Sequence, residues 1–263
     1  MFVPAVTAAA PRGRLYVVTG QALCVVRDER GPAIPVGPVG EADAAWLVIG
    51  MLGAEACFAR ALAVDEPPPP GTEPVPLRQL FGALPDDDFG IASRALGLTA
   101  WDHDHRHCGR CGGETVRSAH ERVRTCTRCG HGAYPRLSPA VIGLVERDGC
   151  ALLARNARVA LGFHSCLAGF VEVGESLEEA LAREVEEEAG VAITDIRYFG
   201  SQPWPLTGSL MIGFTARWAG GELRPDPTEI VDAGWFRADA LPPVPPPFSI
   251  ARALIDDFVR RHA

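Results

Sequence analysis

Residues 169–191 read GFVEVGESLEEALAREVEEEAGV and predict a tight loop that leads into one short helix. Ser176 is expected to be the N-cap of this helix, because Glu179 three residues later completes a capping box. Gly190 supplies the left-handed residue that commonly follows the last turn of a helix. The predicted helix therefore spans about 177–189.

The placement of glutamates on this helix decides between a solvated face and a functional cluster. The apolar positions that form one stripe at helical spacing are Leu177, Ala180, Leu181 and Val185. Glu184 and Glu188 fall in the middle of that stripe, and Glu187 lies beside them. Partly buried carboxylates repel one another and lose hydration, which destabilises the fold unless a cation joins them. The other glutamates of the helix fit an ordinary solvated face.

A divalent cation is the partner that this acidic cluster predicts. Oxygen-only ligands favour Mg²⁺ or Mn²⁺ over zinc, and magnesium normally bridges to the phosphates of a substrate. Such a site suits the attack of water on phosphorus, with cations that neutralise the charge of the leaving phosphate. Arg183 is the only basic residue between Gly169 and Gly190. It is expected to pair with a neighbouring glutamate and to fix its orientation.

Two C-x2-C pairs predict a structural zinc site. Fourteen residues separate the pair Cys108 and Cys111 from the pair Cys126 and Cys129, slightly fewer than is usual in a four-cysteine zinc ribbon. Four thiolates fill a tetrahedral shell and leave no position for water, so one structural zinc is expected per chain. A redox dithiol is the alternative interpretation. Four histidines near the cysteines are expected to be solvated rather than ligands: His103, His105, His107 and His131.

Composition excludes several classes of protein. The formal charge of −8 disfavours a protein that holds nucleic acid mainly by neutralising phosphates, although residues 106–136 carry seven arginines. The sequence contains no lysine, which excludes a lysine nucleophile or Schiff base. No apolar run approaches the ~20 residues that span a bilayer, and the first ten residues lack a basic segment. We therefore expect a cytoplasmic protein without a membrane partner.

Patterning along the 263 residues predicts a smaller N-terminal α/β domain at 1–104, a zinc ribbon at 105–134 and a larger α/β domain at 135–263. In the first domain, apolar stretches at 15–18 and 22–26 precede a helical pattern at 44–64 and a proline-rich loop at 66–76. In the last domain, the expected strands are 140–146, 150–155, 192–200, 209–218 and 233–237, and the expected helices are 177–189 and 249–261. Strands and helices mixed in this way predict an α/β sandwich.

The acidic loop and helix match the Nudix box G-x5-E-x7-R-E-U-x-E-E-x-G-U, in which U is bulky and aliphatic. The residues that fill its positions are Gly169, Glu175, Arg183, Glu184, Val185, Glu187, Glu188, Gly190 and Val191. The chain thus resembles the Nudix hydrolases. This resemblance implies an α/β/α sandwich with a mixed sheet, here preceded by the four-cysteine zinc ribbon and the N-terminal domain. It also implies hydrolysis of a nucleoside diphosphate linked to another group.

A second segment narrows the resemblance to the NADH pyrophosphatases of the NudC type. Residues 201–205 read SQPWP and are followed by Ser209, similar to the SQPWPFPxS signature of that family, whose members also carry a zinc ribbon before the Nudix domain. Leu206 and Thr207 depart from the signature, where Phe and Pro stand. The resemblance covers about residues 77–263.

The resemblance also implies roles for individual residues. It places Glu184, Glu188, Glu229 and the Ala168 carbonyl around the catalytic metal, with Glu187 supporting them. Arg183 and Glu175 complete the catalytic set. The residues it places near the nicotinamide or adenine are Arg78, Tyr134, Phe170, Gln202, Pro203, Trp204, Pro205, Leu206, Thr207, Gly208, Ser209 and Ala251. Simple core packing is the alternative for the two aromatic rings at 134 and 170.

Three functions remain open at this point. One is hydrolysis of NADH or NAD to nicotinamide mononucleotide and AMP, together with removal of NAD caps from RNA 5′ ends. Another is hydrolysis of a different nucleotide such as ADP-ribose, because the signature departs at two positions. The last is a zinc-ribbon protein that senses a nucleotide without hydrolysing it. The family resemblance also implies a homodimer whose sites borrow residues from the partner subunit.

Overall fold

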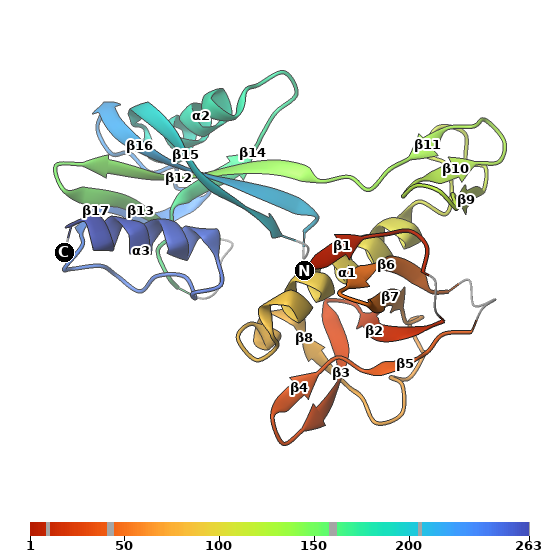
Figure 1. The fold of residues 1–263 in the computed structure, drawn as a ribbon. Helices are drawn as coiled ribbons and strands as arrows, with labels where there is room; N and C mark the ends of the chain where they lie inside the picture. Colours follow the sequence, from red (N-terminus) through yellow and green to blue (C-terminus); the bar gives the residue numbers. More distant parts are fainter. Residues whose placement is uncertain (9–10, 41–44, 158–161, 205–206, 263) are drawn as a thin grey trace. The chain divides into compact units, whose positions relative to one another are not determined.

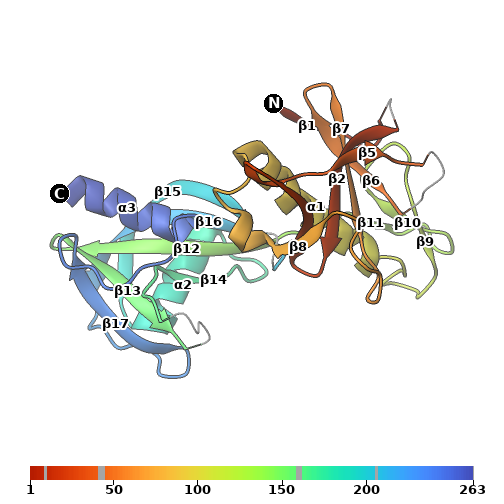
Figure 2. The same cartoon turned by 90° about the horizontal axis from the view of Figure 1, so that it is seen from below.

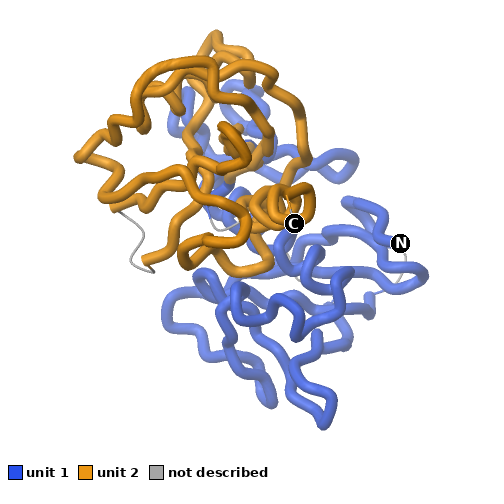
Figure 3. The backbone as a smooth tube through the Cα atoms, turned by 90° about the vertical axis from the view of Figure 1, so that its left-hand side faces the viewer, with its two compact units in different colours: residues 1–136, 205–208 blue, residues 137–204, 209–263 orange. Residues whose placement is uncertain are grey.

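The computed structural model describes residues 1–8, 11–40, 45–157, 162–204 and 207–262. The chain divides into two compact units (Figure 3). Unit 1 comprises Met1–Arg136 with Pro205–Gly208, and unit 2 comprises Leu137–Trp204 with Ser209–Ala263. The boundary predicted between residues 104 and 105 falls within unit 1, so the separation of the first domain from the ribbon stays a prediction.

Unit 1 contains an eight-stranded sheet among its described residues, in the order β1-β6-β7-β2-β3-β4, with β5 beside β2 and β8 beside β3. The strands are β1 (Phe2–Pro4), β2 (Arg12–Thr19), β3 (Ala22–Asp28), β4 (Gly31–Ala33), β5 (Val36–Pro38), β6 (Leu47–Leu52), β7 (Glu55–Ala61) and β8 (Glu73–Pro76). After a 3-10 turn, η1 (Leu77–Leu80), helix α1 (Asp86–Asp104) packs on this sheet. Buried Ile91, Ala95 and Trp101 of α1 share one core with Tyr16 and Leu23 of the strands.

One prediction for this unit is wrong, and another holds only in part. The helical pattern at 44–64 forms the antiparallel strands β6 and β7 in its described part, with Gly53 in a left-handed turn at φ 59°; residue 44 lies outside the described part. A short run of apolar residues fits the periodicity of a helix or of a strand. Here β6 pairs with β1 and β7 pairs with β2, and this pairing stabilises the strands. The proline-rich loop predicted at 66–76 is present at 66–72, but its last four residues form strand β8, which pairs with β3.

Residues 105–134 form a small three-stranded sheet in the order β11-β10-β9. Its strands are β9 (Thr115–Arg117), β10 (Arg124–Cys126) and β11 (Gly132–Ala133). Strands of two or three residues cannot bury a core of their own, so other interactions must stabilise this module.

Unit 2 contains a six-stranded mixed sheet, as far as its described residues show, in the order β15-β16-β12-β13-β17 with β14 beside β12. The strands are β12 (Ser138–Arg147), β13 (Cys150–Asn156), β14 (Leu167–Phe170), β15 (Ala192–Trp204), β16 (Ser209–Gly220) and β17 (Ile230–Arg237). The β12–β16 pair is parallel and the others are antiparallel. The strands expected at 140–146 and 150–155 are confirmed and form an antiparallel hairpin, in whose turn Asp148 and Gly149 both have positive φ.

Helices cover the two faces of this sheet: α2 (Leu177–Ala189) lies on one face and α3 (Ile250–His262) on the other (Figures 1 and 2). Side chains alternate along β12, so that Val141 and Val145 join the core under α2 while Ile142 and Leu144 join the core under α3. The predicted α/β/α sandwich is therefore confirmed. In the described chain, no helix is both long and apolar enough to cross a membrane.

Candidate active site

Helix α2 has the termini that its sequence predicts. The Ser176 side chain accepts a hydrogen bond from the Glu179 backbone, and the Glu179 side chain accepts one from the Ser176 backbone. Gly190 ends the helix in the left-handed conformation at φ 73°. Leu181 and Val185 are fully buried against the sheet. This packing sets the rotation of the helix and brings two of its glutamates toward β14.

Arg183 connects the loop to the acidic cluster. Its guanidinium donates to both oxygens of Glu175 at 2.7 and 3.0 Å, and to the Phe170 carbonyl at 2.9 Å. One nitrogen, Nη1, also donates to Glu184 and to Glu187, each at 2.9 Å. The expected pairing of Arg183 with neighbouring glutamates is thus present. A bidentate, charge-assisted contact of this kind holds the loop and the helix in one geometry.

Glu188 is the most deeply buried carboxylate of the cluster. It is 5% exposed, and its Oε2 atom has no hydrogen-bond partner in the described structure. Burial, followed by repulsion from Glu184, raises the pKa of Glu188 to about 7, although the Ala168 backbone N–H opposes this effect. A buried carboxylate oxygen without a partner is rare in a folded protein, and its position beside Glu184 favours a ligand there.

The charges of Glu187 and Glu229 act on both Glu184 and Glu188. Burial raises the pKa of Glu184 despite its contact with Arg183, and the charges of Glu187 and Glu229 add to that rise. Glu229 lies in the turn before β17, and its charge also raises the pKa of Glu188. The structure therefore brings this distant glutamate into the electrostatic surroundings of α2.

Gly169 makes room for the Glu184 carboxylate. A Cβ atom added at Gly169 would lie 1.8 Å from Glu184 Cδ and 2.0 and 2.1 Å from its two oxygens. Residue 169 lies in β14 opposite Val141, so the sheet holds its backbone in place. Only glycine allows the carboxylate to approach the strand this closely.

This donor set fits a divalent cation that prefers oxygen ligands. The carboxylates of Glu184 and Glu188 supply oxygens, and the partnerless oxygen of Glu188 is the observation that favours a cation. Among the described residues, only the four cysteines bring three or more ligand atoms within 4.8 Å of one another. At the glutamate cluster, water and substrate phosphates would complete the shell of such a divalent cation. Glu187 is 60% exposed, so the expectation of a partly buried carboxylate is wrong for this member of the cluster.

The two aromatic rings expected near the nucleotide are both exposed. Phe170 is 56% exposed at the end of β14 in unit 2, and Tyr134 is 54% exposed in unit 1, where its hydroxyl lies 3.4 Å from Glu121. Core packing, the alternative interpretation for these rings, is therefore wrong. Arg78 is exposed in η1 of unit 1.

The SQPW segment forms the end of β15, and its side chains contact unit 2 itself. Gln202 and Trp204 contact the segment before α3, while Pro203 is exposed. Of the other expected substrate residues, Ser209 is 3% exposed and Ala251 is 7% exposed, whereas Thr207 is exposed and Gly208 half-buried. Pro205 and Leu206 lie outside the described residues.

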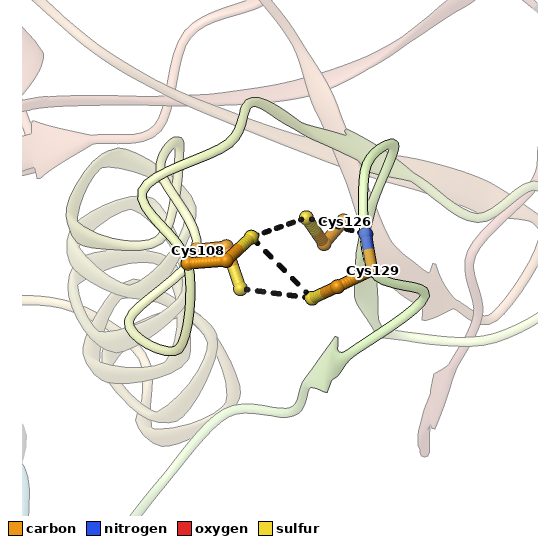
Figure 4. Close-up of side chains that lie close together, drawn as sticks. Cys108, Cys126 and Cys129 are labelled. Carbon is orange, nitrogen blue, oxygen red and sulfur yellow. Dashed lines mark hydrogen bonds between the residues drawn. The ribbon is translucent and has the colours of Figure 1, made fainter.

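The four cysteines of the ribbon converge on one point (Figure 4). Their sulfur atoms lie 3.5 to 3.7 Å apart in the pairs Cys108–Cys129, Cys111–Cys126 and Cys111–Cys129. Four thiolates at about 2.3 Å from a zinc ion would be about 3.8 Å apart at the corners of a tetrahedron. The arrangement therefore fits one structural zinc better than a redox dithiol.

Backbone groups of the two cysteine turns favour thiolates. The N–H groups of Cys129 and Arg128 donate to Cys126 Sγ at 3.4 Å each, and they lower the pKa of Cys126 to about 6 against the opposing effect of burial. The backbone N–H of Arg110 lowers the pKa of Cys108 in the same way. Within the described structure no histidine joins the cysteine cluster, and His103 and His107 are exposed as expected. The other two, His105 and His131, are half-buried.

A buried ionic network attaches the ribbon to α1. Asp102, which is 4% exposed, accepts hydrogen bonds at 2.6 Å from both Arg117 and Arg124. Arg124 also donates to the Thr115 hydroxyl and carbonyl, each at 2.9 Å. These interactions were not predicted, because an aspartate in the stretch WDHDH looks like part of a solvated helix end. They also use two of the seven arginines that suggested a basic surface.

Comparisons with known proteins agree with this architecture. The family described as "NUDIX domain" matches residues 135–258, "NADH pyrophosphatase-like rudimentary NUDIX domain" matches residues 4–101, and "NADH pyrophosphatase zinc ribbon domain" matches residues 103–134.

Individual relatives cover most of the chain. A Pseudomonas aeruginosa protein called NAD-capped RNA hydrolase NudC is 47% identical over 203 residues, which are 77% of this chain and 73% of that protein. A Chromobacterium violaceum protein of the same name is 43% identical over 248 residues, covering 94% of this chain and 91% of that protein. Among solved structures, a NUDIX hydrolase from Nitrosomonas europaea is similar with 24% identity and a TM-score of 0.49, covering 60% of this chain and 90% of that chain.

Proposed function

Because the chain belongs to the Nudix hydrolases of the NudC type, we propose that it hydrolyses the pyrophosphate bond of NADH or NAD to nicotinamide mononucleotide and AMP. We propose that it also removes NAD caps from RNA 5′ ends, the activity that the names of its relatives state. The observation that carries the proposal is the partnerless buried oxygen of Glu188 beside Glu184, at a position where a cation and a phosphate would complete the site.

The proposed cation site uses Glu184, Glu188 and Glu229 together with the Ala168 carbonyl. When bound there, Mg²⁺ or Mn²⁺ would neutralise charge on the pyrophosphate oxygens and activate a water. Burial of Glu188 and its repulsion by Glu184 favour cation binding, because a positive charge removes both costs.

The other residues of the cluster are proposed to orient these ligands. Arg183 holds Glu184 and the loop through Glu175, so that the carboxylate faces β14 before substrate arrives. Glu187 is held by the same guanidinium while it stays exposed. Preorganisation of this kind removes the need to reorder charged groups during the reaction.

The substrate contacts remain proposals from the family resemblance. The exposed face of Phe170, next to the carbonyl held by Arg183, supports stacking with a nicotinamide or adenine ring. Tyr134 and Arg78, both exposed in unit 1, are proposed to contact the nucleotide as well. The homodimer and the cytoplasmic location also stay predictions from the resemblance and the sequence.

A substrate panel tests this function. Purified protein with Mg²⁺ or Mn²⁺ is incubated with NADH, NAD, NAD-capped RNA and ADP-ribose, and the products are identified by mass spectrometry. We expect AMP and nicotinamide mononucleotide from NADH, and 5′-monophosphate RNA from the capped substrate. The Glu188→Gln variant, which keeps the shape of the side chain, should lose most of the rate. Nucleotide binding without turnover by the wild-type protein would instead identify a sensor, and a marked preference for ADP-ribose would contradict the NADH assignment.

A further inference from the structure

Arg122 of the ribbon binds backbone carbonyls of the first sheet instead of a carboxylate. Its Nη2 donates to the Ala5 carbonyl at 2.6 Å and to the Ile49 carbonyl at 3.5 Å, and its Nη1 donates to the Val48 carbonyl at 3.3 Å. The remaining donor atom, Nε, has no partner among the described residues. The carbonyls therefore fix the position of this half-buried guanidinium without supplying a negative charge.

A second arginine, Arg94 of α1, lies at the same place on the sheet. Its guanidinium carbon is 5.0 Å from the centre of the Phe2 ring. That ring lies against Gly50, where an added Cβ atom would be 2.2 Å from it. Gly50 directly follows Ile49, whose carbonyl accepts from Arg122. Both guanidinium groups therefore lie where β1 pairs with β6, and Arg94 is exposed there.

No carboxylate of the described chain neutralises this pair. One turn from Arg94 in either direction, α1 carries only glycine, isoleucine and leucine. Burial, followed by the charge of Arg94, lowers the pKa of Arg122, and no carboxylate opposes this effect. Two like charges, one of them half-buried, thus lie together, and a bound anion would offset the cost of that arrangement. Five other arginines of unit 1, by contrast, each contact an aspartate or a glutamate: Arg14, Arg27, Arg60, Arg117 and Arg124.

We propose that Arg94 and Arg122 bind a phosphodiester group of the RNA that follows the cap. This inference rests on the proposed function, because it assigns a site to the body of a capped RNA. Guanidinium groups present several N–H donors in a geometry that matches phosphate oxygens. NADH has no phosphate outside its pyrophosphate, so the site acts on the RNA substrate alone. A single contact of this kind also agrees with the formal charge of −8, which disfavours binding along an extended basic surface.

RNA binding without turnover tests the site directly. A short 5′-monophosphate RNA, which has no pyrophosphate to cleave, is titrated with protein at several salt concentrations, and its fluorescence anisotropy is measured. Arg94→Gln, an exposed change, should weaken binding at low salt by roughly 3- to 10-fold and reduce the salt slope by about 0.7. The control Arg12→Gln loses the same charge on β2, the third strand from β1, and should bind as wild type.

Two outcomes of the titration would overturn the proposal. One is unchanged binding by Arg94→Gln. The other is equal weakening by Arg94→Gln and Arg12→Gln, because that result would reflect only the net charge of the chain. Arg122→Lys keeps the charge but cannot reach all three carbonyls, so it should also weaken binding. If Arg122→Lys folds poorly, the exposed Arg94→Gln variant still decides the question.

Kinetics with both substrates separate this inference from the proposed function. Arg94→Gln should raise KM for NAD-capped RNA by the same factor and leave kcat/KM for NADH unchanged, whereas equal losses for the two substrates would overturn the site. An enzyme that hydrolyses NADH, and whose RNA binding is insensitive to Arg94→Gln, would refute the site and keep the function. RNA binding that depends on Arg94, without turnover of any nucleotide, would support the site and contradict the function.

Inorganic phosphate distinguishes a free anion from RNA as the source of the phosphate group. An RNA chain that is held at more than one point binds more tightly than a lone anion. At constant ionic strength, phosphate should therefore displace the RNA only at a concentration far above that of the RNA itself. Phosphate that binds wild type more tightly than the RNA does, and loses this affinity in Arg94→Gln, would identify a free-anion site and overturn the RNA assignment.

Discussion

The Gly169→Ala substitution tests whether the Glu184 carboxylate must lie against strand β14. The new methyl group would lie 1.8 Å from Glu184 Cδ, whereas ordinary van der Waals contact begins at 3.4 Å. The carboxylate must therefore withdraw by roughly 1.5 Å, because β14 is paired with β12 and cannot move freely. Its withdrawal would move a proposed metal ligand and disturb its contact with Arg183.

The expected loss follows from that displacement. A misplacement of about 1 Å in a catalytic group can cost about 10²-fold in rate, so kcat should fall by about 10²-fold or more. Stability should change little, since Gly169 does not have a left-handed backbone and alanine can adopt its conformation. The melting temperature is expected to stay within a few degrees of wild type.

The assay compares initial rates of AMP release from NADH over a range of Mn²⁺ concentrations. Gly200→Ala is the matched control in the same unit, because a Cβ there meets no atom of the described residues within 4 Å. Gly169→Ala should need more Mn²⁺ for half-maximal rate, and Gly200→Ala should behave as wild type. A Gly169→Ala enzyme with kcat within threefold of wild type and the same Mn²⁺ requirement would refute the placement of Glu184 in the reaction.

Three further predictions concern charge and zinc. The folded state raises the pKa of Glu188 from 4.5 to about 7. Ionised Glu188 therefore destabilises the folded state by nothing below pH 4 and by roughly 3 kcal/mol once the pH has risen through 7. Without Mg²⁺ or Mn²⁺, Glu188→Gln should have a higher melting temperature than wild type at pH 8 and the same one at pH 4, and equal melting temperatures at pH 8 would contradict this. Asp102→Asn leaves buried Arg124 without its carboxylate and should destabilise unit 1 by about 3–5 kcal/mol in urea unfolding, whereas the exposed Asp104→Asn should cost little. Cys126→Ser should reduce zinc from one equivalent per chain to well below one by elemental analysis, and zinc content equal to wild type would exclude the four-cysteine site.

Local pattern predicted much of the fold and of the candidate site. The capping box and glycine of α2, its apolar stripe and the two C-x2-C pairs are properties of adjacent residues, and the structure reproduces each of them. The hairpin between β12 and β13 was predictable for the same reason, since its turn residues accept positive φ. Helical spacing alone also predicts that Glu184 and Glu188 face inward, as the structure has them.

Other features depend on residues that are distant in the sequence. The stretch at 44–64 became strands because neighbouring strands of the sheet supply hydrogen bonds that an isolated segment does not have. Gln202 turned out to bond with Phe248 and Ile250, which no spacing in the SQPW segment indicates. Asp102 looked solvated, yet it is buried by two arginines that arrive from the ribbon.

The sequence by itself determined which helix carries the acidic cluster, which four cysteines form the ribbon, and the mixed α/β character of the larger domain. Only the tertiary structure decided which carboxylates are buried and which stay exposed, and how strongly their charges act on one another. The physical reason is that helix caps and cysteine turns depend on neighbours within a few residues. Desolvation and charge repulsion depend instead on what the whole fold packs around each group.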